Sequence, residues 1–319
     1  MSVSSGIRAC LGIQGAALTI ALAAAAAGTP AGAAGRDACD ERCLDEIGGE
    51  YLDSLTANDS GDVPLSPALR STENGVELPV TAGIWTTATG WAYRHTFVDP
   101  LTGGIGIYGV VHEAGDQDAM VAIRLKVAGR QIVESERIVT RRGDFALFDP
   151  EGLTQVSPLF TRVEPVESRS ARADLEKTAH DYFGALAAGE PRLVAMHPDA
   201  YRIENGVRTT DNPPRFGLSV REGIRRSVYI ASHHQFRTPV IDVRRGLVWA
   251  VLSADMPAVD RTIQVRGKPV VVAAKDHALP RSMWLFELFK VVDGQIVAIE
   301  TVMRNEPLGA DMGWGDPGR

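Results

Sequence analysis

The sequence predicts an α+β fold in which one unit, a helix followed by an antiparallel sheet, is written twice. The motif Glu-Asn-Gly-Val occupies residues 73–76 and returns at residues 204–207, a shift of 131 residues. A second echo relates residues 126–136 to residues 290–300, now at a shift of 164 residues. In each copy, helical spacing of apolar residues precedes the motif and β-rich stretches follow it.

The difference between the two shifts (164 minus 131) places 33 additional residues inside the second copy. A period this long excludes a solenoid and indicates a duplicated domain. We therefore predict five segments along the chain. They are a signal peptide (1–34), a first domain (35–142), a linker (143–171), a second domain (172–306) and a C-terminal tail (307–319).

Apolar residues recur at intervals of three and four in residues 40–57 and again in residues 173–188. This spacing predicts one leading helix in each copy. A further helix is predicted at residues 220–231, where it would account for part of the insertion. Residues 64–70 are expected to form a short second helix or a turn.

Ten stretches rich in β-branched and aromatic residues are predicted to be strands. They are residues 80–87, 91–97, 105–112, 120–127, 131–139, 238–243, 247–254, 269–274, 283–291 and 295–303. Asp293-Gly294, between the last two, is a strong signal for a type I′ hairpin. The Asn-Gly pair of each repeated motif predicts a turn with positive φ, and Glu73 and Glu204 are interpreted as structural residues that hold that turn.

The first residues resemble a targeting segment rather than part of the folded domain. Arg8 is the one charged side chain of this region, the apolar run spans residues 11–27, and Ala31-Gly32-Ala33 provides a small-x-small cleavage site. This pattern predicts a secretory signal peptide that leaves no membrane anchor after cleavage. The mature protein is therefore expected to be periplasmic or secreted.

Two cysteines remain after that cleavage, Cys39 and Cys43, four residues apart at the start of the first predicted helix. In an oxidising compartment they could form a local disulfide, whose small loop makes its entropic contribution modest. They are a poor match to a zinc site because no histidine stands at ligand spacing. The adjacent pairs at residues 112–113 and 233–234 would point to opposite faces of a strand, so we predict no metal.

Composition is ordinary for a globular protein, with 45% hydrophobic and 23% charged residues. The net charge of −7 and a pI near 5.6 argue against a nucleic-acid partner, which would require clustered Lys and Arg. No phosphate-binding loop, nucleophile elbow or His-Glu-x-x-His motif is present in the sequence. We therefore predict no cofactor and a small-molecule substrate, with a homo-oligomer as a further expectation.

The order of several short motifs resembles a known family. The first copy carries Cys-x-x-x-Cys-Leu, Tyr-Leu-x-x-Leu, the Asn-Gly turn and Arg-Leu-Lys-Val at residues 124–127. The second carries Arg-x-Glu-Asn-Gly at residues 202–206, Val-Ile-Asp at 240–242 and Glu-Leu-Phe-Lys at 287–290. This series is similar to the tandem SnoaL-like proteins of the NTF2-like superfamily, over nearly all of the mature chain.

That resemblance implies two cones, each a curved sheet wrapped around helices and enclosing an apolar pocket. Enzymes of the superfamily are cofactor-free isomerases, dehydratases, cyclases and epoxide hydrolases, and tandem members are similar to lyases that deformylate lignin-type aromatic dimers. The superfamily also contains non-catalytic binding domains, so the resemblance alone does not decide the function.

Trp91, Tyr93, His95 and Phe97 alternate along one predicted strand and are therefore expected to share one face. An aromatic face that carries a hydroxyl and an imidazole suits a pocket for a planar organic ligand. The alternative is a packed core in which backbone groups satisfy the Tyr and His tips.

In the final hairpin, the predicted register places Glu287 opposite Glu300. Two carboxyl groups on an apolar face would raise the pKa of one of them, which suits a general acid with its partner as base. A register shifted by one residue, or cationic partners among Arg281, Lys290 and Arg304, is the alternative. The equivalent pair is missing from the first copy, so the two copies are expected to differ in role.

Two functions therefore stand as hypotheses. The first is a cofactor-independent lyase, dehydratase or isomerase that acts on a small apolar substrate, including phenolic, lignin-derived compounds. Glu287 and Glu300 would act as acid and base, and Tyr93 and His95 would orient the substrate or exchange a proton. The predicted substrate-binding residues are Trp85, Trp91, Trp284 and Tyr201. The second hypothesis is a non-catalytic periplasmic module that binds small molecules or serves in assembly.

Overall fold

The computed structural model describes residues 39–265, 267–273 and 279–314. The predicted signal peptide at residues 1–34 lies outside these residues. Two six-stranded sheets share one strand order: β2-β1-β6-β5-β4-β3 in the first half and β8-β7-β14-β13-β10-β9 in the second. In each sheet one neighbouring pair is parallel, β1 with β6 and β7 with β14, and the other pairs are antiparallel.

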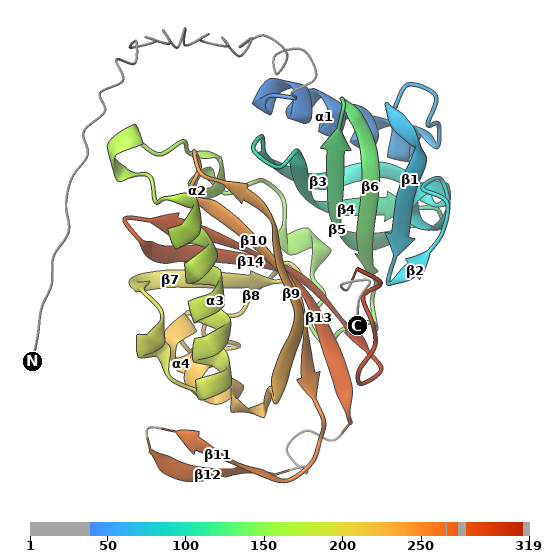
Figure 1. The fold of residues 1–319 in the computed structure, drawn as a ribbon. Coiled ribbons are helices and arrows are strands. Elements are labelled where there is room, and N and C mark those ends of the chain that lie inside the picture. Colours follow the sequence, from blue (N-terminus) through green and yellow to red (C-terminus); the bar gives the residue numbers. More distant parts are fainter. Residues whose placement is uncertain (1–38, 266, 274–278, 315–319) are drawn as a thin grey trace, which may run out of the picture. The chain divides into compact units, whose positions relative to one another are not determined.

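The first half begins with helix α1 (Glu41–Ala57), which packs against the first sheet (Figure 1). Its strands are β1 (Leu65–Glu73), β2 (Val76–Glu77), β3 (Ala88–Asp99), β4 (Gly104–Glu113), β5 (Gln117–Ala128) and β6 (Gln131–Thr140). A 3₁₀ turn, η1 (Gly83–Thr86), precedes β3. The connection to the second half holds η2 (Pro150–Gly152), α2 (Pro158–Thr161) and η3 (Val166–Ser168).

The second half repeats this order with helix α3 (Arg172–Ala188) against the second sheet (Figure 1). Its sheet strands are β7 (Met196–Glu204), β8 (Val207–Arg208), β9 (Ser232–Asp242), β10 (Leu247–Met256), β13 (Arg281–Val292) and β14 (Gln295–Glu306). The additional elements are η4 (Pro191–Leu193), α4 (Val220–Arg226), η5 (Ser227–Tyr229), and the separate hairpin β11 (Arg261–Val265) with β12 (Lys268–Val272).

The predicted α+β class is confirmed, with helices packed on one face of a curved sheet in each half (Figure 1). This is the arrangement that the resemblance to SnoaL-like, NTF2-like cones implies. Three local predictions are wrong. Residues 65–70 belong to strand β1, in which Leu65 and Arg70 pair with β6, and the stretch predicted as a strand at 80–87 contains η1. The helix predicted at 220–231 ends at Arg226 and continues as η5.

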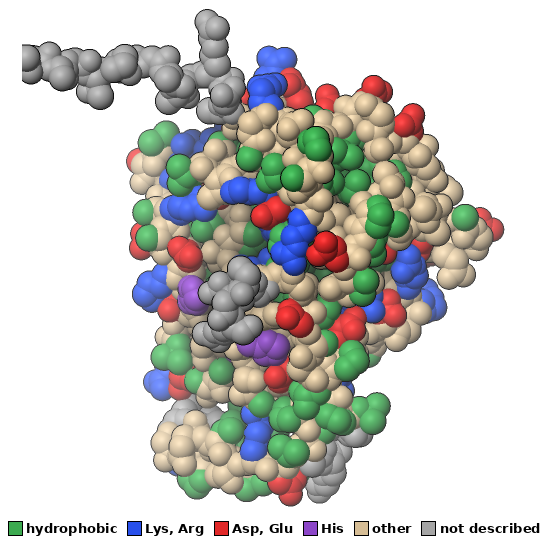
Figure 2. Space-filling model, turned by 45° about the vertical axis from the view of Figure 1, so that its right-hand side comes forward, with side chains coloured by type: hydrophobic (Ala, Val, Ile, Leu, Met, Phe, Trp, Pro, Cys, Tyr) green, Lys and Arg blue, Asp and Glu red, His purple; other side chains and the backbone are tan. Residues whose placement is uncertain are grey.

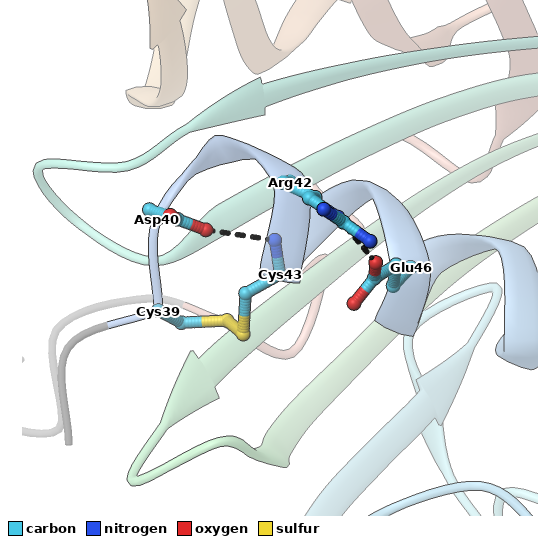
Figure 3. The surroundings of a disulfide bond; sticks show 5 residues. All are labelled: Cys39, Asp40, Arg42, Cys43 and Glu46. Atoms are coloured by element: carbon cyan, nitrogen blue, oxygen red, sulfur yellow. Dashed lines mark hydrogen bonds and ion pairs between the residues drawn. A yellow bond between two sulfur atoms is a disulfide. The ribbon is translucent and has the colours of Figure 1, made fainter. Parts of the chain in front are cut away.

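The predicted disulfide between Cys39 and Cys43 is present at the start of α1 (Figure 3). Asp40 is the N-cap residue of the same helix, and its carboxylate accepts a hydrogen bond from the Cys43 backbone N–H at 2.9 Å. An Asp side chain at this position satisfies one of the free N–H groups of the first turn. Cap and disulfide together fix where the helix begins.

Both Asn-Gly turns have the predicted positive φ, 49° and 76° at Asn74 and Gly75, and 45° and 78° at Asn205 and Gly206. Each Asn side chain also accepts a backbone hydrogen bond from the closing strand of its own sheet, at 2.9 Å from Val139 and at 2.8 Å from Met303. A Cβ at the second glycine would lie 1.8 Å from the Asp149 carbonyl oxygen. The turns are therefore packed structural features, not exposed loops.

The described residues form three hydrophobic cores, one inside each half and one between the halves. The first two lie on the helix side of their sheets, one under α1 and the other under α3. The third lies between the two sheets and includes residues of both, such as Tyr108 of β4 and Trp249 of β10. The Tyr108 hydroxyl accepts a hydrogen bond from the Trp249 indole at 2.8 Å, and their rings meet edge to face. Each sheet is therefore covered on both faces.

The C-terminal tail is irregular up to residue 314 and returns to the first half. The Trp314 ring lies between two guanidinium groups, 4.1 Å from Arg70 and 4.4 Å from Arg124. Its indole N–H also donates to the Thr72 hydroxyl at 2.7 Å. Cation–π contacts of this kind attach the end of the chain to the first sheet.

Candidate functional site

The predicted pairing of Glu287 with Glu300 is wrong. Strand β13 places Glu287 opposite Thr301 and Leu288 opposite Glu300. The register shifts because of a β-bulge after the hairpin, where Lys290 pairs with Ala298 while the next residue pairs two positions away, with Ile296. One extra residue in a strand moves every following side chain to the other face.

The two carboxyl groups therefore lie on opposite faces of the second sheet. Glu287 faces the helix side, where it lines a cavity with Tyr182 and Leu186 of α3. Glu300 faces the first half, where it accepts a hydrogen bond from the Tyr93 hydroxyl at 2.9 Å. Both are only 3% exposed, so each must be judged with its own surroundings.

On the helix side, the sheet aligns three polar residues in a row across neighbouring strands. Glu204 of β7 is in register with Thr301 of β14, and Thr301 is in register with Glu287 of β13. Two strand spacings separate the carboxyl-bearing backbones, which amounts to about 10 Å. We call Glu204, Thr301 and Glu287 the carboxylate row.

The cavity beside this row has a volume of about 40 Å³. It is lined by Tyr182, Phe183, Leu186, Arg202, Glu204, Ser227, Tyr229, Ile230, His233, Met283, Leu285 and Glu287. A space of this size holds water but not an aromatic ring, since a benzene-binding cavity has about 150 Å³. Its walls carry both apolar and polar side chains.

Arg202 is the cation of the cavity, and three partners fix its guanidinium. Its Nε lies 3.3 Å from a carboxylate oxygen of Glu204 and donates to the Thr209 hydroxyl at 3.3 Å, while Nη1 donates to the Tyr182 hydroxyl at 3.1 Å. Glu204 and Arg202 lie two residues apart on β7, so both point to the same side of the sheet. The pair is therefore a preformed charged group at the edge of the cavity.

Burial dominates the electrostatics of Glu287. Burial raises the pKa of Glu287 to about 8, although the nearby Arg202 and the Tyr182 hydroxyl act in the opposite direction. The carboxyl group therefore holds its proton at neutral pH and can donate it. Burial also lowers the pKa of His233 to about 4, so this imidazole at the cavity wall is neutral.

The equivalent row in the first half is Glu73, Arg137 and Ile123. Here the arginine takes the central position, where it is 0% exposed, lies 3.5 Å from Glu73 and donates to the Val80 carbonyl oxygen at 2.6 Å. Ile123 replaces the acid. The second half has a short threonine at the centre instead, which leaves space beside the row, and its arginine comes from the neighbouring strand.

Three predicted catalytic residues, Tyr93, His95 and Glu300, come together in the core between the sheets. Burial raises the pKa of Glu300 to about 7, although the Tyr93 hydrogen bond acts against that change. His95 lies 3.9 Å from Glu300, which is too long for a hydrogen bond, and burial lowers the pKa of His95 to about 3. Phe97 and Phe160 pack against its ring. This cluster is a packed core.

Trp91 does not share a face with Tyr93, which corrects the predicted alternation. A bulge between them pairs Trp91 with Val111 and Tyr93 with Val110, so Trp91 turns to the helix side. Its indole N–H donates to the Leu52 carbonyl oxygen of α1 at 3.0 Å.

The other predicted substrate-binding residues are also dispersed. Trp85 is in the core of the first half, edge to face with Tyr51 at 5.1 Å. Trp284 belongs to the core between the sheets, and Tyr201 packs against that core and donates to the Ser157 hydroxyl at 3.2 Å. None of the three lines the cavity of the second half.

Sequence reasoning missed Arg202 and assigned Glu204 to a purely structural role. The available signal was their spacing of two on a β-strand, beside a motif already recognised as repeated. In the first copy the residue that corresponds to Arg202 is Ser71, so the repeat itself marks the arginine as a difference between the copies.

Within residues 39–265, 267–273 and 279–314, no three or more His, Cys, Asp or Glu side chains are grouped to hold a metal ion. The helices of the same ranges include none with the length and hydropathy needed to cross a membrane. Acidic and basic side chains are interspersed across the face drawn in Figure 2.

Comparisons with known proteins point to the second half. Residues 168–303 match the model of a domain of unknown function, DUF8021. These residues include α3, the carboxylate row and the second sheet except for the last three residues of β14. No curated protein matches the chain.

Three solved structures are similar to parts of the chain. A de novo designed protein with a curved β-sheet is 14% identical, covering 32% of this chain and 88% of its own, with a TM-score of 0.27. AclR of Streptomyces galilaeus, a proposed hydroxylase, is 14% identical over 46% of this chain and 89% of its own (TM-score 0.29). A proposed SnoaL-like polyketide cyclase of Jannaschia sp. CCS1 is 11% identical over 44% and 90% (TM-score 0.26).

Proposed function

We propose that the second half is a cofactor-free acid–base enzyme of the dehydratase class, which removes or adds water at a small organic substrate. The observation that carries this proposal is that a carboxyl group and an ion pair face one cavity. A carboxyl group that is protonated at neutral pH, Glu287, faces the same space as the charged pair of Arg202 and Glu204. A buried carboxyl group that holds its proton can act as the acid, and a second carboxyl group at the same cavity can supply the base.

The arrangement of these groups around the cavity suggests a role for each in the reaction. Glu204 would take a proton from the carbon next to a carbonyl group, and Glu287 would give its proton to the departing hydroxyl. A carbon–carbon double bond forms, the C–O bond breaks and water leaves. Arg202 would hold Glu204 in place and stabilise the negative charge that develops on the carbonyl oxygen.

The two acids lie on strands about 10 Å apart, with only the short Thr301 side chain on the strand between them. The cavity of about 40 Å³ accommodates the water that is lost or added. A ring-sized substrate requires a wider opening, and η5 and the start of β9 contribute Ser227, Tyr229 and His233 to the lining. The apolar walls favour a small apolar substrate, with phenolic compounds as the first class to test.

We further propose that the chain is a secreted tandem SnoaL-like protein that works in the periplasm or outside the cell. The disulfide between Cys39 and Cys43 supports this proposal, since disulfides persist in oxidising compartments. The apolar leader at residues 1–34 is the segment that would direct export.

The experiment compares purified mature protein with two variants, Glu287→Gln and Glu300→Gln, on small β-hydroxy ketones that carry a phenol ring. Formation of the conjugated product is followed by its ultraviolet absorbance. Loss of the general acid is expected to lower kcat by about 100-fold or more in Glu287→Gln. Glu300→Gln is the matched control, because it replaces a buried acid on the opposite face of the same sheet.

The pH profile provides a second readout. Activity of the wild type is expected to decline above about pH 8, as Glu287 loses its proton. Equal rates in wild type and Glu287→Gln would refute the assigned role.

A binding module without chemistry is the second candidate, and the first half favours it. In the first half the equivalent row of side chains includes Arg137, which neutralises the glutamate beside it. The chain therefore also contains a copy of this fold without a proton-donating acid in its row. Absence of turnover across the panel, together with a Glu287 carboxyl group whose pKa lies near its ordinary value of 4.5, would support this candidate over the enzyme.

A further inference from the structure

A second cavity lies where the ends of the two sheets meet, and it shares no lining residue with the cavity beside the carboxylate row. It has a volume of about 190 Å³ and lies between the β3–β4 turn, the β9–β10 turn and the first residues of α1 and α3. We call it the junction slot. Its apolar side chains are Val98, Pro100, Leu101, Ile241 and Val243.

We propose that the junction slot binds a neutral, single-ring phenol. The ring would fill the apolar slot, and the phenol hydroxyl would donate a hydrogen bond to the carboxylate of Asp242. This is a binding site separate from the proposed active site, and the argument for it does not depend on the chemistry of the second half.

The size of the slot fits one ring. An apolar cavity of about 150 Å³ in another protein binds benzene, so about 190 Å³ accommodates a ring with one substituent. At its edge Leu101 is 79% exposed, although it lies next to the apolar walls. A bound ring would remove part of this leucine from water, which favours binding.

The walls are held in place before any ligand arrives. Asp99 accepts two hydrogen bonds from Arg172, at 2.9 and 2.6 Å, and a third from the Ile241 backbone N–H at 3.2 Å. Arg244 pairs with Glu41 at the other side of the slot. These bonds join the four elements β3, α3, β9 and α1, so little conformational entropy remains to be lost on binding.

The same ion pairs select the charge of the ligand. Most charged groups around the slot already have partners, and both signs are present, so neither a cation nor an anion is favoured. Asp242, a residue that is 4% exposed, is held more loosely, because its Oδ2 lies 3.6 Å from the Arg245 Nε, beyond hydrogen-bond distance. Its Oδ1 accepts from the Arg245 backbone N–H at 3.0 Å, whereas Oδ2 has no hydrogen-bond partner among the described residues. Rotation of this carboxylate would present an acceptor to a neutral hydroxyl group.

The test is a titration of the full mature chain with phenol, followed by methyl NMR, with toluene as the probe that lacks the hydroxyl. Saturable shifts are expected at the methyl groups of Ile241, Val243 and Leu101. Phenol should bind about tenfold more tightly than toluene, because a hydrogen bond to a carboxylate is charge-assisted. Asp242→Asn should remove most of that difference.

Surface variants keep the test independent of folding. Leu101→Asp places a charge at the edge of the slot and should weaken phenol binding by about tenfold or more. Leu279→Asp is the matched control, since Leu279 is 70% exposed and lies outside the slot, and it should leave binding unchanged. The proposal is overturned if phenol shifts methyl groups of the second-half cavity instead, if both variants weaken binding equally, or if toluene binds the wild type as tightly as phenol.

Discussion

Replacing Glu287 by Gln should make the protein less sensitive to alkaline pH. In the folded chain burial raises the pKa of this carboxyl group to about 8, whereas in the unfolded chain it titrates near the ordinary value of 4.5. Between those values the folded state binds one proton more than the unfolded state. The free energy of unfolding therefore falls as pH rises through this range and levels off above pH 8.

Two buried histidines act in the opposite direction, but at lower pH. Burial lowers the pKa values of His95 and His233 to about 3 and about 4, so their contribution to stability grows with pH only up to the ordinary value of 6.5. Above about pH 6.5 the contribution of these two histidines levels off, and the buried carboxyl groups lower the free energy of unfolding as pH rises. From there to pH 8 is about 1.5 pH units, which corresponds to a loss of about 2 kcal/mol from Glu287. Glu300, with its pKa near 7, adds a smaller part.

The measurement is urea-induced unfolding at about pH 6.5, 7.5 and 8.5, with circular dichroism and tryptophan fluorescence as independent probes. The wild type should lose about 2 kcal/mol or slightly more over this range, and Glu287→Gln should lose less than half as much. Glu50→Gln, which changes an exposed glutamate of α1, should behave as the wild type. A wild-type stability that is constant or rises from pH 6.5 to 8.5 would refute the reasoning.

Two further predictions concern packing. Gly206→Ala should lower the free energy of unfolding by about 3 kcal/mol, because the residue has positive φ and its new Cβ would overlap a backbone carbonyl. Gly294→Ala, also at positive φ but in open space, should cost only about 1 kcal/mol, and equal urea midpoints would contradict this account. Trp314→Ala should cost about 1–2 kcal/mol through loss of its two cation–π contacts, measured in the same way; an unchanged midpoint would show that the tail does not stabilise the first sheet.

The repeat was enough to predict the fold class, because a duplicated order of helix and strands has few other solutions. The candidate site was predicted only in part. Glu287 was selected correctly as a buried acid, but its partner was not, because a β-bulge near Ala298 reverses the facing of the residues beyond it. A second bulge does the same to Trp91. A bulge adds one residue without a distinctive sequence, so register errors of this kind follow from the period of two.

The position of the cationic group was also beyond local sequence patterns. Arg137 and Arg202 lie on strands that do not correspond in the two halves. Each nevertheless forms an ion pair with the glutamate of the turn motif in its own half. An alignment of the copies shows these residues as unrelated differences, and only the strand register reveals that they are alternative solutions for balancing a buried carboxylate.

The core between the sheets has a consequence for how this protein can change. In a symmetric dimer every substitution occurs twice, so a change that opens one interior opens the other as well. Here the two interacting sheets belong to a single polypeptide, and Tyr108 of one bonds to the backbone of the other at Glu300. One half can therefore keep a filled interior and stabilise the whole chain. The other half can then carry buried acids in its interior. In a symmetric dimer, both subunits would have to accommodate those acids.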